Sequence, residues 1–463
     1  MIYIVGAGPG ESGLLTLRGY EVLRRADVVI YDHLVGEGIL AWIPETAERI
    51  FAGKFAGNHT MTQQEIQSAM IERAMSGKIV VRLKGGDPYV FGRGGEEAEA
   101  IIRAGLPFEV VPGVTSAVAV PAYAGIPVTH RDYCSGASIH TAHHCGDNTQ
   151  SATKIFLMGA GNSESLQAEL LAAMSPDTPC AVIQNGTTSR QITVRTTLVH
   201  LHESVVSSSI TPPAVIVAGN VASLNLSWRE GLPLVSKRII ITRPEGRAEK
   251  LSSMLRDLGA EVILMPTIRT SILHRSLDGL SLGGWDWAGF TSVTGVEALF
   301  TLLCEAGRDI RELGGAKIAA IGSATRDALK SHGLKVDYMP GVYDGHHMAE
   351  GLADFGGKIL MFRAENGTPE IEQVFRNYGI DSTNICLYRT DYVQLSHVPE
   401  FADIIIFTSS STVRGFAANT GSLRDAEAVC IGRQTADEAL RAGFHRVRIA
   451  EQAAVEAIVK ACT

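Results

Sequence analysis

The sequence has few aromatic residues, no paired cysteines and no long hydrophobic run. Aromatic residues make up 6% of the 463 residues, and the seven cysteines are scattered without a Cys-x-x-Cys pair. Such cysteine usage is typical of reduced thiols in a cytoplasmic protein. No apolar run reaches the length of a membrane span, and the chain begins directly with a strand-like segment rather than a signal peptide. We therefore expect a cytoplasmic protein without a membrane partner.

The charge balance argues against binding to nucleic acid. The chain has 41 basic and 49 acidic residues, which gives a net charge of −8. A nucleic-acid partner usually requires a basic surface. A polyanionic small molecule would instead need a local basic pocket. The length predicts at least two domains, since single cores stop growing at about 250–300 residues.

Strand-like and helical patterns alternate along the chain, which predicts an α/β fold. After residue 225 the alternation lapses into a polar segment with glycine and proline, and a new strand begins at Arg238. We place a boundary there, with domains at residues 1–235 and 236–463. The expected strands of the first part are Tyr3–Val5, Asp27–Tyr31, Ile79–Leu83, Phe108–Val111, Lys154–Met158, Cys180–Gln184 and Ala214–Gly219.

The second part contains an internal echo. The segment from Trp287 to Val296 resembles the segment from Ile404 to Val413, and both contain Phe-Thr-Ser. Two further segments share Ile-Gly-x-x-Thr, starting at Ile321 and Ile431. The copies lie too far apart for a solenoid repeat. They predict two similar α/β lobes that line a cleft with hydroxyl-bearing and glycine-bearing turns.

The most informative segment runs from Val80 to Glu97. It begins as a strand, breaks at Gly85-Gly86 and places Asp87 on the turn before a second glycine-rich loop. A glycine pair lets backbone approach a ligand closely, and an acid at a strand end can bind ribose hydroxyls or a charged amine. Two other glycine-containing turns occur in order along the chain, Gly6-Ala-Gly-Pro-Gly10 and Val111-Pro-Gly-Val-Thr-Ser116.

These three motifs together closely resemble the uroporphyrinogen-III C-methyltransferases of the tetrapyrrole methylase family. The resemblance implies a two-lobed fold with S-adenosylmethionine bound between the lobes and S-adenosylhomocysteine as a product. It also implies a homodimer through this domain. A dinucleotide site is the alternative for the first glycine loop, but Glu11 replaces the third glycine and Pro9 lacks a backbone donor. The implied cofactor-binding residues are Pro9, Gly85, Gly86, Asp87, Val90, Thr115, Ser116, Met158 and Gly186.

The resemblance also implies residues for proton transfer and substrate binding. Asp32 matches the family's proton acceptor and Lys54 its proton donor, whereas the alternatives are a helix cap and a solvated lysine. Arg93 matches a catalytic position and can bind carboxylates through its planar fork. Glu96 and His143 are the implied substrate contacts. Further candidates for a carboxylate-binding pocket are Arg18, Arg82, Lys84, His130 and Arg131.

One segment departs from the family pattern. Ala142 stands before His143 where the family has glycine, and His144 and Cys145 follow. With His140 these residues could suggest zinc, but tetrahedral zinc sites draw ligands from separated segments and no second cluster is present. We therefore expect no metal.

The second part looks like uroporphyrinogen-III synthase. The matching pieces are Thr242-Arg-Pro244, the repeated Phe-Thr-Ser and Ile-Gly-x-x-Thr turns, and Cys386-Leu-Tyr-Arg-Thr390. Tyr388 aligns with the family tyrosine suspected of assisting departure of the substrate hydroxyl, and its alternative role is packing at a strand end. Hydroxyl-bearing turns at helix N-termini can bind carboxylates, although each could be only a helix cap. The residues expected on such turns are Ser292, Thr325, Ser409 and Thr435.

The two resemblances predict one bifunctional enzyme. It would cyclise hydroxymethylbilane to uroporphyrinogen III with inversion of the last ring, and methylate that product twice to precorrin-2 for sirohaem or cobalamin synthesis. One alternative is a tetrapyrrole methylase acting later on the corrin route, which Arg93 and Lys54 disfavour. The other is a methyltransferase whose second part is a non-catalytic binding or dimerisation module.

Overall fold

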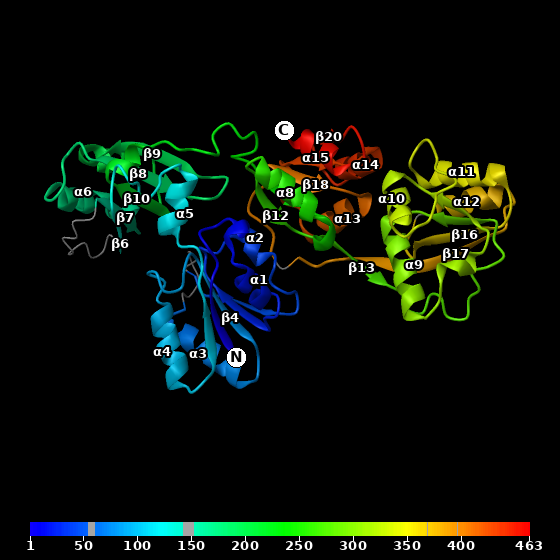
Figure 1. Ribbon diagram of the computed structural model, residues 1–463, viewed down its shortest axis with the longest axis horizontal. Helices are drawn as coiled ribbons and strands as arrows, with labels where there is room; N and C mark the ends of the chain where they lie inside the picture. The colour runs from blue at the N-terminus through cyan, green and yellow to red at the C-terminus, as the bar shows by residue number, and fades with distance from the viewer. Residues whose placement is uncertain (54–60, 142–151, 368, 396) are drawn as a thin grey trace. The chain divides into compact units, whose positions relative to one another are not determined.

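The computed structural model describes residues 1–53, 61–141, 152–367, 369–395 and 397–463. It forms two compact units, residues 1–267 with 394–463, and residues 268–393. The units together contain four five-stranded sheets, each flanked by helices (Figure 1). This architecture confirms the predicted α/β class. No described helix combines the length and hydropathy needed to cross a bilayer.

The first sheet is fully parallel, in the order β3-β2-β4-β1-β5. Helices α1 and α2 pack on one face, and α3 and α4 on the other, so the central strands β2, β4 and β1 are buried on both sides. This burial explains the continuous apolar runs of the strands. The elements are β1 Ile2–Gly6, α1 Leu17–Leu23, β2 Val28–Tyr31, α2 Glu37–Leu40, β3 Glu48–Phe51, α3 Gln63–Met75, β4 Val80–Lys84, α4 Gly94–Arg103 and β5 Phe108–Val111.

The second sheet is mixed, in the order β6-β7-β10-β8-β9. Its central strand β10 runs antiparallel to both neighbours. Helix α5 covers one face, and α6 and α7 cover the other. The elements are α5 Ser116–Tyr123, β6 Ala137–Thr141, β7 Thr153–Leu157, α6 Ser163–Leu171, β8 Pro179–Gln184, β9 Ile192–Thr197, α7 Leu201–Ser207 and β10 Ala214–Ala218.

The third sheet is parallel, in the order β12-β11-β18-β19-β20. Helices α8 and α15 pack on one face, and α13 and α14 on the other. The side chain of Leu234 lies within this core, 1% exposed. A fragment meant to hold this sheet should therefore begin before Leu234, while the domain limits 1–235 and 236–463 stay a prediction. The elements are β11 Arg238–Ile241, α8 Glu249–Asp257, β12 Glu261–Leu264, β18 Ile404–Phe407, α13 Ser410–Asn419, β19 Glu427–Cys430, α14 Arg433–Arg441, β20 Val447–Ile449 and α15 Val455–Cys462.

The fourth sheet forms the second unit, in the order β13-β17-β16-β14-β15. Only β13, paired with β17, is antiparallel. Helices α9 and α10 pack on one face and α11 and α12 on the other, so both lobes predicted from the internal echo are present. The elements are β13 Ile268–Ile272, β14 Trp287–Phe290, α9 Val293–Glu305, β15 Lys317–Ala320, α10 Ser323–Ser331, α11 Gly345–Phe355, β16 Ile359–Ala364, α12 Glu370–Asn377 and β17 Ser382–Tyr392.

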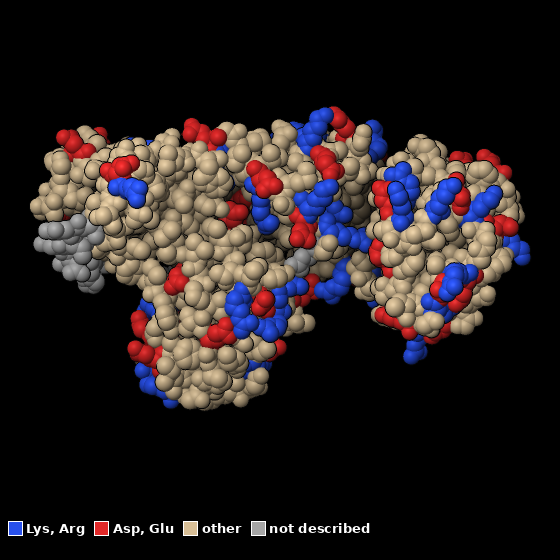
Figure 2. All heavy atoms as spheres, in the orientation of Figure 1, with Lys and Arg blue, Asp and Glu red and all other residues tan. Residues whose placement is uncertain are grey.

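Basic and acidic side chains are interspersed on the visible surface (Figure 2). Many charged residues of the chain form exposed ion pairs, such as Arg433 with Asp437 and Lys460 with Glu451. Exposed pairs of this kind contribute little to stability, about 0–1 kcal/mol each. They are ordinary surface features and do not indicate a ligand.

Candidate active sites

The carboxyl edge of the first sheet brings the predicted cofactor motifs together. Gly6 at the end of β1 is paired with Lys84 at the end of β4, and Tyr31 at the end of β2 with Leu83. The four loops that follow β1, β2, β4 and β5 therefore emerge at one edge. In open α/β sheets this edge is the usual place for a ligand.

Glycine backbones form the centre of this edge. Gly8 and Gly86 exchange two backbone hydrogen bonds, of 3.1 and 2.7 Å, which join the first loop to the loop after β4. A Cβ atom at Gly6 would lie 2.5 Å from the Cα atom of Gly113, so no larger residue fits there. Pro9 follows Gly8 and is partly exposed. These loops present bare backbone, as close approach by a ligand requires.

Asp87 ties two of the loops together. Its Oδ1 atom accepts a hydrogen bond from the N–H of Tyr89 at 2.8 Å, and its Oδ2 atom accepts one from the N–H of Gly113 at 3.1 Å. A carboxylate can accept about four hydrogen bonds. Asp87 therefore retains capacity to accept from a ligand while it fixes the loop geometry. The backbone N–H of Val90 closes the same turn onto the carbonyl of Asp87 at 3.4 Å.

Thr115 and Ser116 begin α5. The Thr115 hydroxyl accepts a hydrogen bond from the N–H of Ala117 at 3.3 Å, so Thr115 is the N-cap. Ser116 is the first helical residue, and both side chains are partly exposed. In this capping bond the hydroxyl oxygen of Thr115 is the acceptor, so the hydroxyl can still donate its own proton to another group.

The second lobe contributes loops with unusual backbone conformations. Met158 has a φ of 57° and is 50% exposed, so it is not part of the packed core. Thr187, beside Gly186, has a φ of 72°. A Cβ atom at Gly186 would clash with the side chain of Val120 on α5. Left-handed non-glycine residues carry strain and concentrate at functional sites.

A polar contact that the sequence did not predict joins the two lobes. Glu11 accepts a hydrogen bond from the Tyr123 hydroxyl at 2.8 Å, and its own N–H donates to the Thr187 hydroxyl at 3.2 Å. Burial, with the nearby Glu11 carboxylate, raises the pKa of Tyr123, so the phenol stays protonated and donates. No sequence signal marked this contact beyond the presence of Glu11 where a dinucleotide-binding loop would have glycine.

Asp32 lies directly after β2 at the same edge. Its Oδ1 atom accepts a hydrogen bond from the N–H of Leu34 at 3.0 Å, which closes a turn. The alternative of a helix cap is wrong for α2, whose N-cap is Gly36. The side chain is 21% exposed. The predicted partner Lys54 lies outside the described residues.

Arg93 and Glu96 pair with each other at the start of α4. Two hydrogen bonds of 2.9 and 2.7 Å join the guanidinium to the carboxylate, and both side chains are more than half exposed. The pairing raises the pKa of Arg93 and lowers that of Glu96. Arg93 also has a φ of 59°. A substrate carboxylate would therefore compete with the carboxylate of Glu96 for the guanidinium of Arg93.

Two of the further carboxylate-binding candidates are wrong. Arg82 and Lys84 are each 4% exposed and both contact the buried carboxylate of Glu97. They point into the packed face of β4, because residues 80, 82 and 84 alternate toward α3 and α4. Arg18 is paired with Glu109 at 2.8 Å on the surface.

No described group of three or more histidine, cysteine or acidic residues could hold a metal ion. His140 on β6 contacts the Ser138 hydroxyl at 2.7 Å and stacks on Phe156. His143, His144 and Cys145 lie outside the described residues. The predicted substrate contact by His143 stays a prediction.

In the second unit, Tyr388 and Ser292 come together. The hydroxyl of Tyr388 lies 2.8 Å from the Oγ atom of Ser292, and that oxygen also accepts the N–H of Gly295 at 2.9 Å as the N-cap of α9. Tyr388 is only 7% exposed and its ring packs in the core. The contact places a phenol beside a helix N-terminus, where negative charge is stabilised.

The repeated threonines are not on turns. Thr325 and Thr435 lie in the first turns of α10 and α14, 3% and 4% exposed, and the N-caps are Gly322 and Gly432. Both residues are therefore buried rather than presented on an open turn. Ser409 is an N-cap, like Ser292, and accepts the N–H of Thr412 at 3.3 Å.

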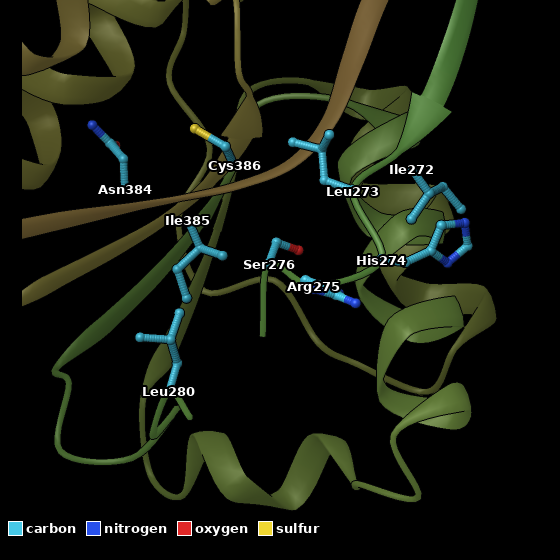
Figure 3. Close-up of a pocket in the computed structure, with 9 residues that line it drawn as sticks. All are labelled: Ile272, Leu273, His274, Arg275, Ser276, Leu280, Asn384, Ile385 and Cys386. Atoms are coloured by element: carbon cyan, nitrogen blue, oxygen red, sulfur yellow. The ribbon is translucent and has the colours of Figure 1, made fainter. Parts of the chain in front are cut away.

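A pocket of about 610 Å³ opens beside β13 and β17 (Figure 3). Its lining is largely apolar and includes Ile272, Leu273, Ile385 and Cys386. Burial raises the pKa of the Cys386 thiol, which keeps it protonated. Tyr388 is not among the described residues that line this pocket.

Comparison with known families gives a match to each half. Residues 1–202 match the family described as Tetrapyrrole (Corrin/Porphyrin) Methylases. Residues 249–460 match the family described as Uroporphyrinogen-III synthase HemD.

Curated relatives cover the whole chain or its first half. The chain is 39% identical to the porphyrin biosynthesis protein HemD of Ruminiclostridium josui, over 99% of this chain and 96% of that protein. It is 45% identical to the S-adenosyl-L-methionine-dependent uroporphyrinogen III methyltransferase of Methanosarcina barkeri, over 48% of this chain and 92% of that protein. Among solved structures, uroporphyrin-III C-methyltransferase from Thermus thermophilus is 37% identical, covering 48% of this chain and 96% of that one, with a TM-score of 0.44.

Proposed function

The chain belongs to the tetrapyrrole methylases over residues 1–202 and to the uroporphyrinogen-III synthases over residues 249–460, and we propose from this that it performs two successive reactions. The second half cyclises hydroxymethylbilane to uroporphyrinogen III. The first half transfers two methyl groups from S-adenosylmethionine to that product and gives precorrin-2. The observation that carries this proposal is the alignment with the HemD protein along 99% of the chain, which favours two enzymes over a methyltransferase with an inert module.

The residues at the sheet edge fit S-adenosylmethionine. Bare backbone at Gly85 and Gly86 admits a flat ligand, Asp87 can accept hydrogen bonds from ribose hydroxyls, and exposed Met158 offers an apolar surface. When bound, S-adenosylmethionine supplies an electrophilic methyl group. The protein's main contribution is then to hold donor and acceptor in line, which can supply much of the acceleration. Pro9, Val90, Thr115, Ser116 and Gly186 complete the proposed binding set.

Proton control falls to groups at the end of β2. The nucleophile is a pyrrole carbon, which becomes stronger when a proton leaves the ring. We propose Asp32 as the acceptor, because it lies at the ligand edge and is partly open to solvent. Lys54 is proposed as donor from its family position alone. Arg93, with Glu96, is proposed to bind substrate carboxylates, and His143 to contact the substrate.

For the second half we propose that Tyr388 assists departure of the substrate hydroxyl. Its proton can be delivered while Ser292 and the start of α9 stabilise the phenolate left behind. Ser292, Ser409 and the helix starts that contain Thr325 and Thr435 are proposed to bind carboxylates of the bilane through backbone N–H groups.

Replacement of Tyr388 by phenylalanine should slow enzymatic cyclisation by about tenfold, below the usual range for a general acid because the leaving group is reactive. The measurement is the initial rate of uroporphyrinogen III formation from hydroxymethylbilane. Tyr392→Phe, on the same strand but 52% exposed, is the matched control and should keep the wild-type rate. An unchanged rate in Tyr388→Phe would remove this residue from the mechanism.

The two activities can be separated in the intact chain. Uroporphyrinogen III with S-adenosylmethionine should yield the dimethylated product, and hydroxymethylbilane alone should yield the III isomer. Without enzymatic closure the bilane cyclises to the isomer with an uninverted ring. If the full chain gives only that isomer, the synthase proposal fails and the binding-module alternative takes its place.

We further propose a symmetric homodimer through the first half, as the family resemblance implies, and a cytoplasmic location, which the unpaired cysteines support. The product would serve sirohaem or cobalamin synthesis. Light scattering at micromolar concentration should give twice the mass of the 49.5 kDa chain. A monomer at that concentration would contradict the dimer.

A further inference from the structure

A buried cluster of charges lies behind the proposed methyl-transfer site. At its centre is Glu97 of α4, whose side chain is fully buried. One carboxylate oxygen, Oε1, accepts hydrogen bonds from Arg82 Nε at 3.1 Å, Lys84 Nζ at 3.0 Å and Gln63 Nε2 at 3.1 Å. Among the described residues the other oxygen, Oε2, has no hydrogen-bond partner. Two cations therefore share one anion inside the lobe.

The position of this cluster is unusual for a packed face. Arg82 and Lys84 follow Val80 on the side of β4 that faces the apolar core of α3 and α4, which includes Met70 and Ile101. Burial of charges is costly, and apolar residues of similar size are often as stable. Burial, together with the neighbouring charge of Arg82, lowers the pKa of Lys84. A contribution to stability alone therefore does not explain why these charges are buried.

Arg82 connects the cluster to the ligand edge. Its Nη1 atom donates to the backbone carbonyls of Ile30 at 3.3 Å and Leu83 at 3.1 Å, which fixes the plane of the guanidinium. Its Nη2 atom lies 3.6 Å from the Oδ2 atom of Asp32. The Oδ1 atom of Asp32 is held by the N–H of Leu34. Both oxygens of the proposed proton acceptor are therefore oriented by neighbouring groups of the protein.

The net charge of the cluster is zero only when Asp32 is counted together with Glu97 and the two cations. Arg82 and Lys84 are cations, and Glu97 and Asp32 are anions. Without Glu97, the guanidinium loses the acceptor that holds its Nε end and two cations are left against one carboxylate. Arg82 can then move away from Asp32, and the direction in which Asp32 presents its free lone pairs is lost. Catalytic groups generally need such support behind them.

We propose that Glu97 is a positioning residue for methyl transfer, acting through Arg82 to orient the carboxylate of Asp32. This rests on the proposed role of Asp32 as proton acceptor. Glu97 touches neither substrate nor cofactor. It fixes Arg82 through Nε, so that Nη2 at the other end of the guanidinium holds Oδ2 of Asp32 in one orientation. Lys84 donates to the same oxygen of Glu97 as Arg82 does.

The test uses Glu97→Gln in the full chain, because glutamine keeps the shape and one acceptor oxygen. We expect kcat for methylation of uroporphyrinogen III to fall at least about tenfold, since misplaced catalytic groups lose rate steeply. The dissociation constant for S-adenosylmethionine, measured by calorimetry, should change less than about twofold, because the glycine edge is intact. Glu99→Gln, an exposed acid on the same helix, is the matched control and should leave kcat unchanged.

A double-mutant cycle with Asp32→Asn separates positioning from general damage. If Glu97 acts through Asp32, adding Glu97→Gln to Asp32→Asn should cause no further loss in kcat. Losses that multiply would overturn the proposal and leave Asp32 as acceptor. An unchanged kcat in Asp32→Asn alone would instead overturn the role of Asp32, and this inference with it.

A second variant covers the case in which Glu97→Gln does not fold. Lys84→Met with Glu97→Gln removes the cation left without a counter-ion, and neutral replacement of a buried ion pair is usually tolerated. We expect this variant to fold, bind S-adenosylmethionine normally and show the same loss in kcat. Wild-type kcat in the folded double variant would overturn the proposal.

Discussion

Asp87→Ala should reduce the affinity for S-adenosylmethionine by about 100-fold or more without unfolding the chain, since hydrogen bonds to a charged group contribute about 1.5–3 kcal/mol each. Asp87 fixes the loop after β4 to the loop after β5 through the N–H groups of Tyr89 and Gly113. Alanine removes both bonds and the carboxylate proposed to accept hydrogen bonds from the cofactor. The fold should persist, because the hydrogen bonds between Gly8 and Gly86 still join the edge.

Isothermal calorimetry and thermal unfolding measure the two parts of this prediction. Asp27→Ala is the matched control, because Asp27 also accepts a backbone N–H, from Ile79 at 2.8 Å, but lies at the opposite end of β2. The control should bind S-adenosylmethionine normally. Near-normal affinity in a folded Asp87→Ala protein would contradict the proposed cofactor site.

Asp32→Asn should lower kcat for methylation by about 10²–10⁴-fold, the usual contribution of a general base. Asparagine keeps an oxygen for the N–H of Leu34, so the turn after β2 should survive. It cannot accept a proton at the opposite atom, which lies beside Arg82. Binding of S-adenosylmethionine should change little, since the hydrogen bond from Leu34 that closes this turn is kept.

The rate should be measured under single-turnover conditions with uroporphyrinogen III, so that product release does not mask the chemical step. Asp27→Asn serves as control on the same strand and should keep the wild-type rate. A folded Asp32→Asn protein with normal kcat would exclude a proton-accepting role. Cyclisation of hydroxymethylbilane by the same variant should be unaffected, which provides an internal check of protein quality.

The central strands of the sheets were predictable because they are buried on both faces. Continuous apolar runs such as Val28–Tyr31 and Ile404–Phe407 can only be accommodated in a covered sheet, and the Phe-Thr-Ser echo indicated the paired lobes correctly. The glycine turns were predictable for a different reason, because local backbone geometry requires glycine. Gly86 has a φ of 68° and Gly6 has no room for a side chain, so these residues are required by local geometry.

Other features depend on tertiary contacts and left no local signal. Arg82 and Lys84 look like surface cations in the sequence, and only the approach of α4 brings Glu97 onto them. The left-handed conformation of Met158 is set by the loop between β7 and α6 and not by its residue type. Thr325 looked like a turn residue because the helix begins immediately after Gly322, earlier than the pattern suggested.

The most direct test of the account is a single incubation of the purified full-length protein with hydroxymethylbilane, with and without S-adenosylmethionine, followed by identification of the tetrapyrroles. Without S-adenosylmethionine the account predicts uroporphyrinogen III, the isomer with the inverted ring. With S-adenosylmethionine it predicts precorrin-2, which carries two added methyl groups. The uninverted isomer alone in the first reaction, or no methylated product in the second, would contradict the assignment of two activities to this chain.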